Sequence, residues 1–318
     1  MIDMQGLPPS AAANVQIFTA NAPPGIFPTP CFQTWTKPRG ASMVMIYCIG
    51  SGAGGGGGFT GIATSNRGGG GGGGSAAMTG VLLAGPFCPQ ELYVQVAQGG
   101  IGGAAGAAGG PGGTSFVVPG FPYTNGTIAI LTIADTMIAS SNSIATPAIG
   151  GSAGSAAGGN AGGAAGSVST TDTAMALAYG PTFTFSGRAG TASGALGAAG
   201  VNSTGLAVSS APTCAGAGGG SPTNADVNGG RMPGSGWIGE QGLNSNGSSA
   251  LPNGKAGITV WTPVFGSSGG GGGAGINASV GGIGGDGGIG SGGGGGGGGT
   301  TGGAGGNGGG GMVVIVSW

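Results

Sequence analysis

The chain contains no histidine and very little charge, and these two deficits exclude most catalytic and metal-binding sites. Its 318 residues include only 6 Lys and Arg and 7 Asp and Glu, giving a formal net charge of −1. The carboxylates are far apart in the sequence, so no pair has the spacing of a general acid and base. The four cysteines show no CxxC spacing, and we expect buried free thiols rather than zinc ligands. We therefore predict a protein that is not an enzyme and has neither a cofactor nor a metal site.

Other absences limit the partners. The balanced charge provides no electrostatic footprint for nucleic acid or for an anionic membrane. No apolar run approaches the ~20 residues that span a bilayer, and residues 1–10 carry neither the charge nor the apolar stretch of a secretory signal. No Gly-Lys pair is followed by Ser or Thr, which excludes a phosphate loop. We expect no nucleic acid, no membrane insertion and no signal peptide.

What the chain has in abundance is glycine, 89 residues of it, arranged in a register of three. From Gly281 to Gly311 every third residue is glycine without a break. This period predicts extended helices of the polyglycine II type, in which one edge lacks side chains. Such helices have no internal hydrogen bonds, so their N–H and C=O groups need neighbouring helices as partners. Gly305 belongs to this series and lies on the edge without side chains. Gly282 is one residue out of the series, so its position is free to face outward.

Short apolar segments alternate with the glycine tracts and have the composition of β-strands. The segments are 42–49, 81–84, 91–97, 114–118, 127–138, 173–179, 182–186, 257–261 and 312–318. We therefore predict an all-β fold with non-regular structure: a sandwich-like strand framework combined with a bundle of polyglycine II helices and almost no α-helix. Residues 41–318 form this domain, and the proline-containing residues 1–40 are expected to be an N-terminal attachment arm.

Large side chains in polar loops between glycines are the best candidates for a binding surface, because loops on a rigid scaffold commonly carry recognition residues. Three loops have this character, at 59–67, 121–125 and 223–253. The candidate receptor-binding residues are Phe59, Arg67, Tyr123, Arg231, Met232, Trp237 and Glu240.

Both ends of residues 32–318 resemble a glycine-rich domain of bacteriophage virion proteins, chiefly tail fibres. At the first end an aromatic residue and Trp35 precede a Pro38-x-Gly40 motif, a hydrophobic strand and the glycine burst SGAGGGGG. At the other end a glycine tract is followed by a hydrophobic strand, in GGNGGGGMVVIVSW. The chain also resembles phage adhesins that pack glycine-rich segments into a polyglycine II sandwich and bind bacterial receptors with loops at its far end.

The resemblance implies a virion protein, most simply a tail-fibre or adhesin subunit that binds a host-surface protein or glycan. The N-terminal arm would then attach to other virion proteins, and a homotrimer is among the arrangements that the sequence allows. The alternative is a capsid-decorating or head-fibre protein without receptor binding. The run GGAGGNGG also resembles mycobacterial cell-envelope glycine-repeat proteins, but those begin with a helical domain that residues 1–40 cannot form.

Overall fold

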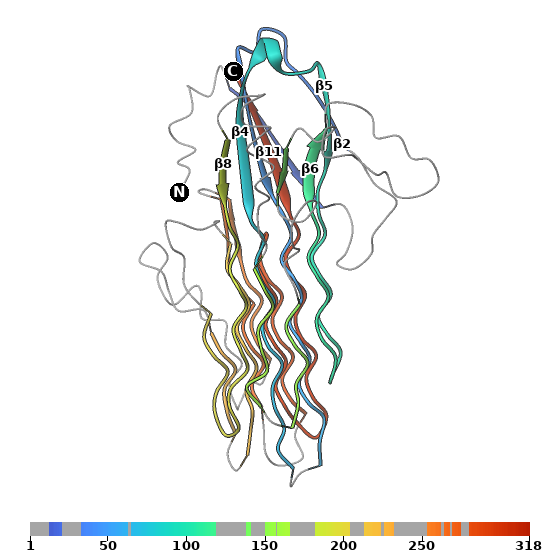
Figure 1. Cartoon of the computed structure of the whole chain (residues 1–318), viewed down its shortest axis with the longest axis vertical. Coiled ribbons are helices and arrows are strands. Elements are labelled where there is room, and N and C mark those ends of the chain that lie inside the picture. Colours follow the sequence, from blue (N-terminus) through green and yellow to red (C-terminus); the bar gives the residue numbers. More distant parts are fainter. Residues whose placement is uncertain are drawn as a thin grey trace, which may run out of the picture.

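The computed structural model describes residues 13–20, 33–62, 65–118, 138–140, 150–156, 158–165, 182–203, 213–223, 226–231, 253–261, 264–267, 269–274 and 280–318. Within these ranges the chain is nearly all β and contains no α-helix. The strands gather at one end of an elongated molecule, and glycine-rich segments extend from them to the other end (Figure 1). Among the described residues, one 3-10 turn, η2 (Gly85–Phe87), lies at the strand end.

The larger sheet has five antiparallel strands in the order β1-β11-β3-β4-β8. Its members are β1 (Asn14–Thr19), β3 (Met43–Ile49), β4 (Met78–Ala84), β8 (Thr182–Phe185) and β11 (Met312–Ser317). The C-terminal strand β11 thus lies between β1 and β3, and the two ends of the chain are tied into one sheet.

The second sheet has four antiparallel strands in the order β2-β5-β6-β7, and a separate pair is formed by β9 and β10. The bounds are β2 (Gln33–Thr36), β5 (Glu91–Gln95), β6 (Ser115–Val118), β7 (Ile138–Ser140), β9 (Thr259–Trp261) and β10 (Val264–Gly266).

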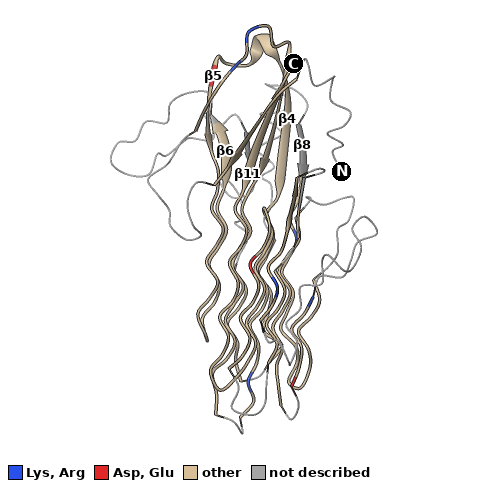
Figure 2. Ribbon diagram, turned by 180° about the vertical axis from the view of Figure 1, so that it is seen from behind, with Lys and Arg blue, Asp and Glu red and all other residues tan. Residues whose placement is uncertain are grey.

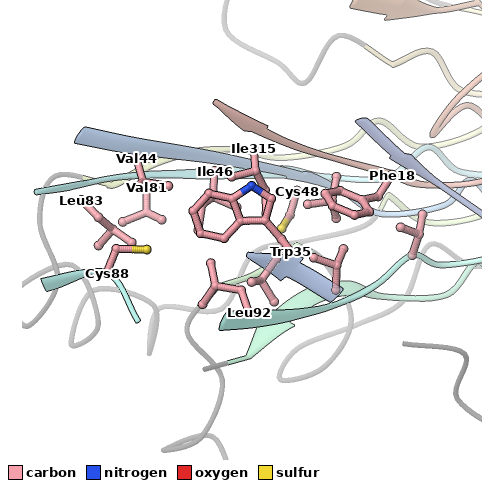
Figure 3. Close-up of a cluster of buried hydrophobic side chains, with 14 residues drawn as sticks. Phe18, Trp35, Val44, Ile46, Cys48, Val81, Leu83, Cys88, Leu92 and Ile315 are labelled. Atoms are coloured by element: carbon pink, nitrogen blue, oxygen red, sulfur yellow. The ribbon is translucent and has the colours of Figure 1, made fainter. Parts of the chain in front are cut away.

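The two larger sheets contribute side chains to one apolar core (Figure 3). Trp35 from β2 and Leu92 from β5 pack in a cluster with Ile46, Leu83 and Ile315 from the five-stranded sheet. All five side chains are completely buried. Removing such side chains from water contributes roughly 1.5–3 kcal/mol each, so this cluster is the main source of hydrophobic stability at the strand end.

The predicted strands within the described residues are confirmed with small shifts of their ends. The segments predicted at 127–138 and 173–179 lie outside the described residues, apart from the first residue of β7. The sequence did not predict β1, β2 or β10. Two of these strands, β1 and β2, lie within residues 1–40 and pair with β11 and β5. This part of the expected arm therefore belongs to the strand framework.

The glycine-rich segments are held together by hydrogen bonds that repeat every three residues. Segment 51–58 follows β3, and each third N–H group in it reaches the same neighbouring segment. The acceptors for successive N–H groups from Gly52 to Phe59 are Gly309, Gly74, Gly110, Gly306, Gly71, Ala107, Gly303 and Gly68. Three segments thus accept in rotation, as a three-fold repeat along the chain requires.

Three further segments donate N–H groups back to the carbonyls of segment 51–58, so it has six neighbours. The donors come from 100–106, 151–154 and 293–296. The same number of neighbours surrounds three other segments, 68–74, 214–221 and 292–299. We call these four the central segments. Every residue in them is buried, and none has a side chain larger than that of cysteine.

Outer segments carry side chains only on the edge that faces away from the bundle. In segment 280–289 the exposed residues Val280, Ile283 and Asp286 recur every third position, and glycine pairs lie between them. Gly282 is buried, and its carbonyl accepts the N–H of Gly297 at 2.8 Å. The offset of Gly282, which the sequence left free to face outward, therefore faces into the bundle. Two of the three edges of segment 280–289 are free of side chains. All three edges are free in the all-glycine run 292–299, because that segment has neighbours on every side.

Polar side chains at the surface accept N–H groups for which no neighbouring carbonyl is in place. Asp286 Oδ1 accepts the N–H of Asn307 at 2.6 Å, and Asn307 Oδ1 accepts the N–H of Gly102 at 2.9 Å. Asn253 Oδ1 accepts the N–H of Ile283 in the same way. These oxygens extend the backbone hydrogen bonding to the rim of the bundle, which an all-glycine rim could not do.

We predict that Gly305→Ala destabilises the protein by more than about 3 kcal/mol, because overpacking and the loss of buried hydrogen bonds add together. A Cβ at Gly305 would overlap the carbonyl of Gly55, so segments 301–311 and 51–58 would have to separate. Gly310→Ala in the same segment is the control. Its Cβ would lie 3.3 Å from Ala20 Cβ and 3.7 Å from Ala97 O, and we expect a change below about 1 kcal/mol. Urea unfolding measures both, and equal midpoints would contradict the close packing.

Candidate functional site

The turns at the end of the bundle away from the sheets form the candidate site, and we call them the distal turns (Figure 1). Their described residues are 59–62, 65–67, 104–107, 155–156, 158, 194–198, 221–223, 226 and 299–301. Isolated bridges connect turns that are far apart in the sequence. The pairs are Thr60 with Gly299, Gly158 with Ala195, and Ala198 with Ser221. A hydrogen bond from the Gly68 N–H to Ser155 O at 2.8 Å joins the turn at 59–67 to the turn at 155–158, so these turns lie next to one another.

The turn between segments 51–58 and 68–74 is fixed by its own hydrogen bonds. The Phe59 N–H donates to Gly68 O at 2.8 Å, and the Ser65 N–H donates to Ile62 O at 2.9 Å. Thr60 Oγ1 accepts the N–H of Gly302 at 2.9 Å, which ties this turn to the turn at 299–301. In this turn the Ile62 side chain is 74% exposed. The turn thus displays an apolar side chain on a base held by backbone contacts.

Two of the predicted site residues, Phe59 and Arg67, border the same glycine in this turn. A Cβ at Gly61 would lie 3.1 Å from Arg67 Cγ and 3.2 Å from Phe59 Cε1, so both side chains border this glycine. Phe59 is half-buried, whereas Arg67 is fully buried and not displayed at the tip. The reason is its position: a Cβ at Gly298 would overlap the carbonyl of Arg67, so this residue already belongs to the packed layer.

Arg231 is exposed but lies partway along the bundle rather than at the distal turns. Its N–H donates to Asn202 Oδ1 at 3.0 Å, and its carbonyl accepts the N–H of Ser203 at 2.9 Å. The other candidates, which are Tyr123, Met232, Trp237 and Glu240, lie outside the described residues.

Thr60 and the pair Thr300 and Thr301 also lie at the distal turns, although they are not among the predicted site residues. Thr301 is exposed and forms a bridge with Val280, whose side chain is 60% exposed. The signal was present, because two threonines interrupt the glycine run at the point where the chain reverses.

Reactive groups are scarce throughout the described residues, and charged side chains are sparse along the glycine segments (Figure 2). Cys48, Cys88 and Cys214 are buried free thiols, as predicted, whereas Cys31 lies outside the described residues. Burial raises the pKa of Cys88 to about 11 and that of Cys214 to about 12, and it raises the pKa of Cys48 further. These thiols stay protonated near neutral pH, so none is a ready nucleophile.

Among the described residues, no three side chains of His, Cys, Asp and Glu lie together in a way that could hold a metal ion. No helix in that part of the chain is long and apolar enough to cross a membrane.

No protein-family model matches the chain, and no curated protein matches it either.

The raised thiol pKa values predict that stability falls in alkali. In the unfolded chain the thiols ionise near pH 9, whereas in the fold Cys88 and Cys214 ionise near 11 and 12. Their contribution is therefore complete below pH 9 and is lost as the pH rises through the folded values, by up to about 1.4 kcal/mol per pH unit for each thiol. Unfolding free energies at pH 8, 9, 10 and 11 test this. The decline should be shallower in Cys88→Ala and in Cys214→Ala than in the native chain, and a decline as steep as the native one in both variants would contradict the prediction.

Proposed function

We propose that the chain is a structural protein of a bacteriophage virion, a tail-fibre or adhesin subunit that binds a host-surface receptor through its distal turns. The observation that carries this proposal is the separation of two ends. The sheets and both termini of the strand framework lie at one end, and the turns that reverse the glycine segments lie at the other. This arrangement suits a protein that is anchored at one end and presents loops at the other.

We further propose that the glycine segments are polyglycine II helices in a hexagonal bundle, carried by a sandwich-like pair of sheets. Six neighbours around each central segment and hydrogen bonds that repeat every three residues support this assignment. The core shared by the two larger sheets supports the sandwich. A bundle of this kind has buried backbone along its whole length, so the distal turns rest on a base that resists bending.

The proposed surface binds its partner without catalysing a reaction, and it consists of the turn residues around Ile62. Its partner is a protein or glycan on the host cell, and other virion proteins hold the opposite end through the N-terminal residues. The resemblance to phage glycine-rich domains supports both partners, as does the low charge of the chain, which suits a subunit of a larger particle.

Two equally exposed side chains at opposite ends test the proposal. Ile62 at the distal turns is 74% exposed, and Phe87 in η2 at the strand end is 75% exposed. Ile62→Asp and Phe87→Asp should therefore have similarly small effects on folding. The measurement is binding of the fluorescently labelled chain to the bacterium that the parent phage infects.

We expect saturable binding of the native chain, at least tenfold weaker binding of Ile62→Asp and unchanged binding of Phe87→Asp. An equal loss in both variants would contradict the assignment to the distal turns. A native chain that does not bind cells would contradict the adhesin function itself and favour a capsid-decorating protein.

A further inference from the structure

Strand β1 lies at one edge of the five-stranded sheet, where it pairs with β11 on its inner side. A sheet edge exposes a row of N–H and C=O groups, and proteins usually protect it with short strands, charges or proline. The other edge strands of the two larger sheets, β2, β7 and β8, have three or four residues each, whereas β1 has six. Its sequence, NVQIFT, contains neither a charge nor a proline. Among the described edge strands of these sheets, β1 is therefore the least protected against pairing with another strand.

The hydrogen bonds of the sheet show which backbone groups of β1 point outward. Trp318 and Met43 exchange two backbone hydrogen bonds, at 3.1 and 3.0 Å, so every second residue of β11 counted back from Trp318 bonds to β3. The alternate residues of β11 bond to β1 instead, and Gln16 is one of their partners. The N–H and C=O groups of Val15 and Ile17 therefore point away from the sheet. No other described segment bonds to them.

The side chain of Gln33 covers one end of this edge. Its Nε2 donates to Thr19 O at 3.2 Å and so occupies the next outward carbonyl of β1. An incoming strand can therefore pair with Val15 and Ile17 without displacing a hydrogen bond, but not with Thr19. An antiparallel strand centred opposite Gln16 uses the outward groups of Val15 and Ile17 and needs none from Thr19.

The side chains of β1 determine which strand fits at this place. Val15 and Ile17 lie on the same face as Val316 and Val314, their partners in β11, and they are 43% and 47% exposed. Gln16 lies on the opposite face and is half-buried. A fitting strand has apolar side chains opposite Val15 and Ile17 and a polar side chain opposite Gln16. A second copy of β1 has this pattern.

We propose that β1 pairs antiparallel with β1 of a second copy and so joins the two five-stranded sheets into one. The two-fold axis is perpendicular to the sheet at Gln16, so each face of the sheet continues across the interface. Val15 then lies opposite Ile17 of the partner subunit, and Gln16 lies opposite Gln16 of the partner subunit. Val15 and Ile17 each exchange both backbone hydrogen bonds across the axis. The formal net charge of −1 causes almost no repulsion between copies.

The size of the interface makes this pairing weak and dependent on concentration. About five residues of strand give a length of about 17 Å, and a thickness of about 10 Å gives roughly 170 Å² per partner. Stable complexes bury ~800 Å² per partner. The pairing becomes effective where many copies are held close together.

The pairing leaves the distal turns of both copies clear of the interface. The strands run along the long axis of the molecule, so an antiparallel pair directs the two glycine bundles away from each other (Figure 1). The inference therefore does not rest on receptor binding, and its tests need no receptor.

Disulfide trapping at the axis tests the pairing. Gln16 would lie between two hydrogen-bonded pairs, which places its Cα about 4.5 Å from that of Gln16 of the partner subunit, a separation that a disulfide can bridge. The Gln16→Cys protein is oxidised at about 200 μM, a concentration that suits weak association. We expect a disulfide-linked dimer. The three described native thiols are buried, and the unsubstituted chain measures the background.

Asn14→Cys is the matched control for the trapping. Asn14 is exposed and lies on the same strand and the same face as Gln16. The axis places it about 14 Å from Asn14 of the partner subunit, which is too far for a disulfide. Equal trapping with Asn14→Cys would overturn the proposal, as would the absence of trapping with Gln16→Cys.

Sedimentation equilibrium of two lysine variants provides an independent readout. We expect a monomer–dimer equilibrium for the native chain and at least tenfold weaker association of Ile17→Lys, because a lysine on an edge strand opposes strand pairing. Ile101→Lys is the control and should associate like the native chain, since Ile101 is 50% exposed but lies on the glycine segment 99–106. Equal weakening by both variants would overturn the proposal, as would a native chain that stays monomeric or forms trimers.

Discussion

Hydrogen bonds between the backbones of side-chain-free segments are the constraint on which the structure depends. A segment with no helix or strand of its own must place every N–H and C=O group on a neighbour, and burial without a partner costs roughly 1–3 kcal/mol per group. A neighbour can come close enough only where no Cβ intervenes. The price in conformational entropy is high, since glycine loses about 0.5–1 kcal/mol more than alanine on ordering. The bundle is therefore stable only as a whole, with each central segment fixed by six others.

Two kinds of packing meet in one chain. At the strand end, Trp35, Ile46 and Leu92 fill an apolar core in the manner of ordinary sheets. Beyond it the same chain continues into central segments with no side chain larger than that of cysteine, as where β3 passes into segment 51–58. The sheets determine where each glycine segment begins along the bundle, because the register of the strands is fixed by their apolar pattern. The bundle then carries that register to the distal turns, where Ile62 and the neighbouring threonines are displayed.

Much of this could be predicted from the sequence because the pattern of glycine reflects the number of neighbours. The run 292–299 contains only glycine and lies at the centre, whereas the triplets ending in Ile283 and Asp286 lie at the rim. The sequence could not predict which segments are adjacent, since glycine tracts carry no side chains that distinguish one neighbour from another. It also missed β1 and β2, because short strands between prolines lack the usual apolar run. The burial of Arg67 was not predicted either, because a charged residue beside a glycine tract indicates an exposed tip unless the packing of the turn is known.

Amide hydrogen exchange tests the central claim most directly. The backbone N–H groups of 68–74 and 292–299 are buried and bonded to neighbouring segments, so they should exchange as slowly as those of β3 and β11. Residue-resolved exchange of the full-length chain supplies the comparison, with a free glycine-rich peptide as the reference. Protection of both glycine tracts at the level of the two strands would agree with a bundle held by its backbone. Exchange of the tracts at the rate of the free peptide, while β3 and β11 stay protected, would contradict it.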